Sequence, residues 1–198
     1  PVSFVAVMVS LCIGMVLGAV AGYFGGVLEN IIMRLMDIFG SVSTILFAIV
    51  LIAAMGIGTP SLMLAMGLSA VPAFSRITRA AVLSVRNQEY VESARAIGCS
   101  NLQIIFRHVV PNCLSPIIVQ TTLRMGSAII SASSLSYLGL GVPAPMPEWG
   151  TLLSAGRAFI IDHGYLTVFP GLAIMVTVIA FNMLGDGLRD AMDPKLKK

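Results

Sequence analysis

The chain has 198 residues, of which 57% are hydrophobic and 11% charged, and its formal net charge is +3. A soluble domain of this size carries about 25% charged residues, because its surface has to be solvated. The composition therefore excludes an ordinary soluble globule and predicts an integral membrane protein.

The apolar residues gather into long stretches, which predict at least five membrane-spanning helices. A span needs roughly 20 apolar residues to cross a hydrocarbon core of about 30 Å, and a helix satisfies its own backbone groups there. The expected fold is all-α, a polytopic helical bundle forming one membrane domain over residues 1–198. The spans are expected near residues 3–22, 31–55, 60–78, 116–137 and 166–188. The chain starts at Pro1 without a methionine, so we expect a native segment to precede it.

Small residues recur at every fourth position of the first predicted span. They are Ala6, Ser10, Gly14, Gly18, Gly22 and Gly26. Such a stripe allows a neighbouring helix to approach backbone to backbone. We interpret it, with Gly14, Gly18 and Gly22 at its centre, as a helix-packing face; the simpler alternative is that glycine is common in membrane helices.

The least hydrophobic segment, residues 87–111, predicts two short helices in a loop. Asn87 is the expected N-cap of the first helix, and Gly98 is expected to end it because glycine tolerates the left-handed conformation. Ser100, with Gln103 three positions later, has the spacing of a capping box for the second. Apolar residues at helical spacing predict one face to be buried against the span ends or another protein. These residues are Leu102, Ile105, Phe106 and Val109.

Arg124 lies inside the fourth predicted span, where a charge is costly. It either faces a water-filled translocation path or extends along the helix to the cytoplasmic interface. The connection 139–165 is rich in proline at first, and its part 151–161 predicts a short helix. That helix either caps the bundle or contacts a binding protein.

Basic residues are concentrated in alternate connections, which predicts the orientation of the chain. Nearly all of them fall in the segment 76–108, in the tail, or just after the turn that follows the first span: Arg76, Arg79, Arg86, Arg95, Arg107, Arg189, Lys195, Lys197, Lys198 and Arg34. The connections 56–59 and 139–165 contain Arg157 alone. Positively charged loops stay in the cytoplasm. We therefore expect the loop 87–111 and the C-terminus to be cytoplasmic and the loop 139–165 to lie outside.

The sequence offers no pattern for catalysis or for a resident cofactor. It contains no GxxxxGK(S/T) phosphate loop, so ATP binding of that kind is not expected. His108 and His163 are far apart and have no second ligand at metal spacing, so no metal site is expected. Nothing indicates a nucleic-acid partner.

Several segments together carry a family resemblance. Glu92-Ser93-Ala94, then Gly98, and later Val110-Pro111 resemble the EAA loop of binding-protein-dependent ABC importer permeases, with Ser93 in place of the middle alanine. Further segments resemble the peptide/nickel branch of these permeases, in particular the C-type subunits of dipeptide and oligopeptide importers. They are residues 22–26, 136–142, 145–150 and 169–190. The likeness covers nearly the whole chain.

The resemblance implies an ABC importer type I permease-like fold and assigns the loop as the element that couples to an ATPase. The coupling residues would be Glu92, Ser93, Ala94, Arg95, Gly98 and Asn101. Glu92 and Arg95 would make charged contacts, Ala94 would allow close approach, and Gly98 would permit the bend.

The resemblance also implies the partners and the activity. They would be a second homologous permease, two cytoplasmic ABC ATPases that bind ATP and Mg²⁺, and an extracytoplasmic substrate-binding protein. The chain would sit in the plasma (inner) membrane of a bacterium or archaeon, and it would import di- or oligopeptides by alternating access without hydrolysing ATP itself. Nickel or another small solute is the alternative cargo. An ion-driven secondary transporter is the rival class, which needs carboxylates near mid-membrane and no docking loop.

Overall fold

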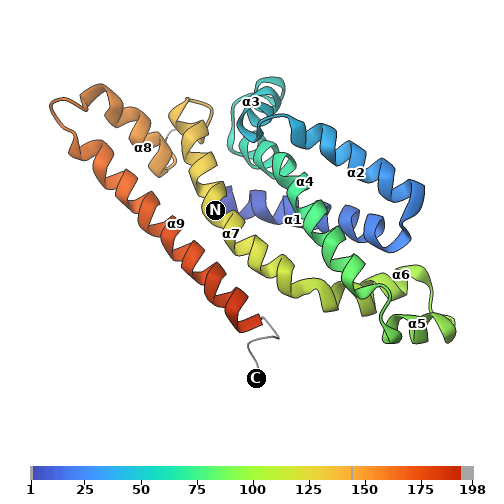
Figure 1. Cartoon of the computed structure of the whole chain (residues 1–198). Helices are drawn as coiled ribbons and strands as arrows, with labels where there is room; N and C mark the ends of the chain where they lie inside the picture. The colour runs from blue at the N-terminus through green and yellow to red at the C-terminus, as the bar shows by residue number, and fades with distance from the viewer. Residues whose placement is uncertain (1, 144, 193–198) are drawn as a thin grey trace.

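The computed structural model describes residues 2–143 and 145–192, and every regular element within them is helical. Four helical runs are long and apolar enough to cross a membrane (Figure 1). They are α1 (Val2–Phe24), α4 (Thr59–Val85), the run Asn101–Tyr137 that ends in α7 (Leu114–Tyr137), and α9 (Tyr165–Met192). The all-α membrane class predicted from the composition is confirmed.

The predicted span 31–55 is two helices instead of one. α2 (Gly26–Ser41) and α3 (Thr44–Met55) meet at an angle of 88°, and the chain has five candidate spans when this pair is counted as one. Val42 and Ser43 break the helix with extended backbones, at ψ values of 138° and 131°. Serine and β-branched residues are weak helix formers, so the break is local. An average of hydropathy over the whole segment does not detect it.

The small-residue stripe of α1 packs against α4. A Cβ atom added at Gly14 would lie 2.5 Å from the Phe74 Cβ, and one added at Gly18 would lie 2.4 Å from the Ser75 carbonyl oxygen. Gly22 meets Val82 in the same way, at 2.9 Å. Gly26 has nothing within 4 Å of an added Cβ, so the packing face ends before it. Because glycine has no side chain, the backbones of α1 and α4 can approach each other closely at these positions.

α4 extends to Val85, beyond the predicted end of the span at residue 78. Arg79 therefore lies on the same helix as Arg76 and not in the following loop. The Arg76 guanidinium lies 3.0 Å from the Asp37 carboxylate, and Arg79 pairs with Glu29. Both carboxylates belong to α2, so these ion pairs hold α2 beside α4.

The predicted outer helix 151–161 corresponds to α8 (Trp149–Gly156) and the 3-10 turn η3 (Arg157–Phe159). α8 packs on both α7 and α9. An added Cβ at Gly150 would lie 2.7 Å from the Ser133 Cα, so glycine is required for this approach to α7. The Ser136 hydroxyl also donates a hydrogen bond of 2.6 Å to Glu148, which fixes the start of α8 on the end of α7.

Four short elements connect α4 to α7 at the opposite end from α3 and α8 (Figure 1). They are α5 (Glu89–Ala96), α6 (Asn101–Ile104), the π-helical turn η1 (Ile105–Val109) and the 3-10 turn η2 (Val110–Cys113). A buried apolar cluster joins them to α1, α4 and α7. Lys195, Lys197 and Lys198 of the predicted basic tail lie outside the described residues.

Candidate functional site

The ends of α5 and α6 follow the turn chemistry predicted from the sequence, with one shift. α5 begins after Gln88, whose ψ is 150°, so the predicted N-cap Asn87 is one residue too early. Gly98 has φ +85°, the left-handed conformation that ends the helix. The Ser100 hydroxyl accepts a hydrogen bond of 3.3 Å from the Gln103 backbone N–H, which confirms the predicted cap of the second helix.

The buried face of the second helix differs from the predicted one. Ile105 and Val109 are buried, as expected, and Ile104 joins them. Leu102 and Phe106, however, are 63% and 59% exposed. The residues 105–109 form a π-helical turn, in which the wider spacing shifts the side chains away from a period of 3.6. The predicted apolar face is therefore divided: Ile105 and Val109 pack against the chain's own helices, whereas Leu102 and Phe106 do not.

Six of the exposed side chains of this loop make up the loop surface. Its members are Glu92, Ser93, Arg95, Ile97, Leu102 and Phe106, all exposed. Ile97 is 81% exposed although it is apolar. Together with the exposed side chains of Leu102 and Phe106, it gives the loop several exposed apolar groups beside charges, which is typical of a surface that another protein covers.

Ala94 does not belong to the loop surface, contrary to the expectation that it meets a partner. It is 3% exposed and lies in the apolar cluster with Val91, which is fully buried. Its small side chain allows α5 to pack closely on the chain's own helices. Within the triplet 92–94, the first two residues face outward and the third anchors the loop.

Tyr23, at the end of α1, connects two of the predicted coupling residues. Its hydroxyl donates a hydrogen bond of 3.1 Å to the Asn101 Oδ1 and accepts one of 3.4 Å from the Arg95 guanidinium. The Arg95 Cζ also lies 5.8 Å from the centroid of the Tyr23 ring. The hydrogen bond that Arg95 donates to the Tyr23 hydroxyl raises the pKa of Arg95 above its usual value. Arg95 and Asn101 are thus tied to α1, and both remain exposed, as Glu92 and Gly98 are.

Reasoning from the sequence assigned no role to Tyr23, although the segment 22–26 carried part of the family resemblance. The distribution of basic residues could have found it, because it places the first turn and the loop 87–111 on one side of the membrane. A second hydrogen bond at the same end of the molecule joins the end of α4 to α1. Arg86, just after α4, donates a hydrogen bond of 2.9 Å to the Gly22 carbonyl.

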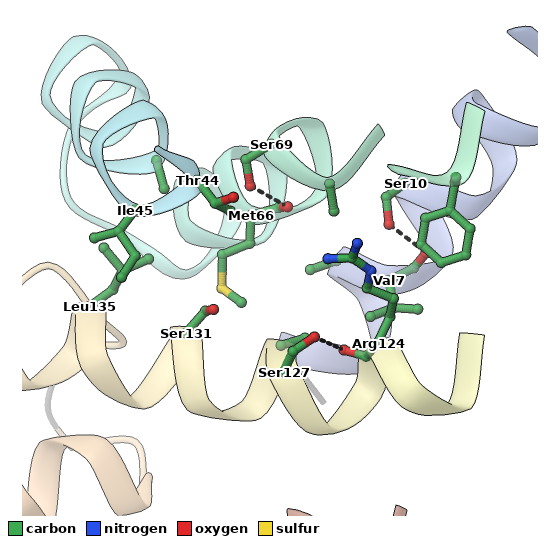
Figure 2. A pocket seen from close by; sticks show the side chains of 15 residues that line it. Val7, Ser10, Thr44, Ile45, Met66, Ser69, Arg124, Ser127, Ser131 and Leu135 are labelled. Carbon is green, nitrogen blue, oxygen red and sulfur yellow. Dashed lines mark hydrogen bonds between the residues drawn. The ribbon is translucent and has the colours of Figure 1, made fainter. Parts of the chain in front are cut away.

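Arg124, near the middle of α7, lines a cavity of about 120 Å³. The walls come from α1, α3, α4 and α7. Figure 2 shows the guanidinium extending away from α7 toward the opposite wall, and not along the helix toward its end. Four serines contribute hydroxyls to the same lining: Ser10, Ser69, Ser127 and Ser131.

The loop surface and the cavity around Arg124 both have the features of binding sites. Among residues 2–143 and 145–192, no group of three or more His, Cys, Asp or Glu side chains could hold a metal ion. The loop surface offers charged and apolar contacts to a protein. The cavity offers a guanidinium and hydroxyls to a small polar group.

Comparison with known proteins gives a family and a fold. A family model described as "Binding-protein-dependent transport system inner membrane component" matches residues 14–198. The chain is 46% identical, over 99% of its length, to the dipeptide transport system permease protein DppC of Alkalihalophilus pseudofirmus. It is 45% identical, over 97% of its length, to the glutathione transport system permease protein GsiD of Pectobacterium atrosepticum. The chain spans about 64% of the length of each of these relatives.

The fold is similar to that of a chain in the inward-facing MetNI methionine ABC transporter. The TM-score is 0.77 at 18% sequence identity, and the match covers 97% of this chain and 91% of that one. A second crystal form of the same transporter matches with a TM-score of 0.71.

Proposed function

The chain belongs to the family of binding-protein-dependent transport system inner membrane components, and on that premise we propose that it is the permease subunit of an ATP-driven importer. The observation that carries the proposal is the loop surface. It presents exposed charged and apolar side chains on a loop that the buried residues Val91 and Ala94 fasten to the spans.

The loop surface is the docking site for a cytoplasmic ATPase. Ile97, Leu102 and Phe106 enter an apolar groove of that partner, and Glu92 and Arg95 make charged contacts at its rim. Two such ATPases serve the transporter and bind ATP with Mg²⁺, while this chain binds neither. Movement of the docked loop reaches α1 and α4 through the buried cluster and the Tyr23 hydroxyl. The spans then alternate between two facing directions.

A second, homologous permease completes the translocation path. α9 supports this because only 11% of its most apolar window is buried within the chain, which leaves a long apolar surface for lipid and a partner. The loop and the C-terminus are cytoplasmic, and α8 faces an extracytoplasmic substrate-binding protein. The distribution of basic residues supports this orientation. The membrane is the plasma (inner) membrane of a bacterium or archaeon.

The cargo is a short peptide or a peptide-like molecule. The names of two relatives, a dipeptide permease and a glutathione permease, support this class of solute. Arg124 lies on the translocation path, which its place in the cavity supports. Nickel or another small solute is the second candidate cargo.

Reconstitution tests the function. The full-length chain, its second permease, its ATPases and its binding protein are placed in proteoliposomes, and uptake of labelled alanyl-alanine is measured with and without ATP. We expect uptake that requires ATP and persists when the proton gradient is collapsed. Uptake that continues without the ATPases and stops when the gradient is collapsed would instead identify an ion-driven transporter.

A pair of variants tests the docking surface. Leu102→Asp places a charge among the contacts of the loop surface, so we expect less ATPase to co-purify with the permeases. Ile161→Asp is the matched control, because Ile161 is an apolar residue with 94% exposure in the outer loop. Equal recovery of the ATPase from both variants would contradict the assignment.

A further inference from the structure

Arg124 has no partner within the part of the chain that the structure describes. The two ion pairs found there join Arg76 to Asp37 and Arg79 to Glu29. The Ser127 hydroxyl donates to the backbone carbonyl of Arg124 and not to its side chain (Figure 2). A cation inside a membrane-spanning helix is costly unless a partner or water satisfies it. The Arg124 guanidinium in the cavity can therefore pair with a group that carries negative charge.

The lining of the cavity makes the guanidinium its main donor. Ser10, Ser69 and Ser127 each donate their hydroxyl hydrogen to a carbonyl of their own helix, at 2.8 to 3.0 Å. Their oxygens are left to accept hydrogen bonds. Ser131 has no hydrogen bond to another described residue, so its hydroxyl can donate. Arg124 is the one ionisable residue among the described residues of the lining, and its planar fork matches a carboxylate.

The size of the cavity limits what can enter. A cavity of about 150 Å³ binds benzene in another protein, and this one measures about 120 Å³. It can hold a carboxylate and the few atoms beside it but not a whole peptide. Thr44 and Ile45, which also line it, are exposed, so the remainder of a solute can extend past them.

We propose that this cavity binds a carboxylate of the transported solute, and that Arg124 is the residue that pairs with it. The inference rests on the proposed function of the chain as a permease. The membrane spans themselves then select among solutes. A solute with a free carboxylate binds in the translocation path, and the same solute with an amide in place of the carboxylate binds more weakly.

The test measures binding without the substrate-binding protein, which would select solutes before they reach the spans. The purified complex of the full-length chain, its second permease and the ATPases is placed in nanodiscs with labelled alanyl-alanine. Unlabelled alanyl-alanine and alanyl-alanine amide compete for the site. A hydrogen bond to a charged group changes binding by about tenfold or more. We expect the amide to compete at least about tenfold more weakly with the wild-type complex.

Variants assign the effect to Arg124. Arg124→Gln should weaken the binding of alanyl-alanine by about tenfold or more and remove the preference over the amide. Arg124→Lys should retain part of the preference, because it keeps the charge but not the planar fork. Arg34→Gln is the control for loss of one positive charge, since Arg34 is exposed on α2 and outside the cavity. It should bind both compounds as the wild type does.

Three outcomes would overturn the carboxylate site. They are no binding by the wild-type complex, equal competition by the amide, and an unchanged preference in Arg124→Gln. Loss of the complex itself in both Arg124 variants, seen by gel filtration, would also overturn it and would assign Arg124 to a contact between subunits. ATP-dependent uptake by the complete wild-type transporter is measured separately. If it is present and the preference is absent, the carboxylate site fails while the proposed function stands; if no cargo is taken up, the proposed function fails.

Discussion

The Tyr23 hydroxyl donates a hydrogen bond of 3.1 Å to the Asn101 side chain, across 78 residues of sequence. Tyr23 is at the end of α1, and Asn101 is the first residue of α6. The bond therefore joins the first span directly to the loop 87–111. The same hydroxyl accepts a hydrogen bond from Arg95, so both short helices of the loop are connected to α1 through one oxygen atom.

Tyr23→Phe removes this connection and keeps the aromatic ring in the apolar cluster. A hydrogen bond of this kind contributes about 0.5–1.5 kcal/mol. We expect a loss of up to about tenfold in the uptake of solute per ATP hydrolysed, with normal insertion and normal association with the ATPase. The ratio of uptake to hydrolysis in proteoliposomes is the measurement.

Tyr165→Phe provides the matched control for this substitution. Tyr165 is 55% exposed at the start of α9, and its hydroxyl bonds to no other described residue. The same chemical change should have no effect there. If Tyr23→Phe also transports normally, movement of the loop reaches α1 through the apolar cluster alone.

Gly98 tests whether the bend between the two loop helices depends on backbone conformation. Its φ is +85°, and an added Cβ would meet nothing within 4 Å, so the cost of a side chain is conformational and not steric. Gly98→Val should cost about 1–2 kcal/mol and lower both ATPase association and uptake. Gly98→Asn should retain more of both, because asparagine tolerates the left-handed region. Equal behaviour of the two variants would contradict this reason for the glycine.

The packing of α1 on α4 depends on Gly18. A Cβ at this position would lie 2.4 Å from a backbone oxygen of α4, which cannot move aside as a side chain can. Gly18→Ala should therefore destabilise the chain by about 1–3 kcal/mol. Gly171→Ala is the comparison, because an added Cβ there meets nothing within 4 Å and alanine favours the helix. Thermal unfolding in detergent should show a lower melting temperature for the first variant only.

The two ion pairs between α2 and α4 should contribute unequally to stability. Arg79 and Glu29 have side-chain exposures of 36% and 17%, whereas Arg76 and Asp37 have 51% and 66%. Exposed pairs contribute about 0–1 kcal/mol. Glu29→Gln should lower the melting temperature in detergent more than Asp37→Asn does, and added salt should reduce both effects. An equal or reversed order would show that solvent exposure does not set the strength of these pairs.

The loop 87–111 shows where reasoning from the sequence succeeds and where it stops. Gly98 and Ser100 could be placed correctly because a helix end depends on the residues immediately around it. The exposure of the Phe106 side chain could not be predicted in this way. Residues 105–109 form a π-helical turn, which has more residues per turn than the 3.6 that a regular helical pattern assumes. Ala94 was assigned to a partner, but the folded chain itself provides the surface that buries it.

The sequence by itself determined that the chain is helical, that it belongs in a membrane and that one loop differs from the rest. These properties depend on composition and on residues close together along the chain. Only the tertiary structure decided that α2 and α3 are separate helices, that Tyr23 contacts Asn101 and that Arg124 points into a cavity. The contact between Tyr23 and Asn101 and the cavity around Arg124 depend on packing between segments far apart in the sequence, which no local pattern encodes. The angle between α2 and α3 depends on the backbone conformations of Val42 and Ser43, which hydropathy does not report.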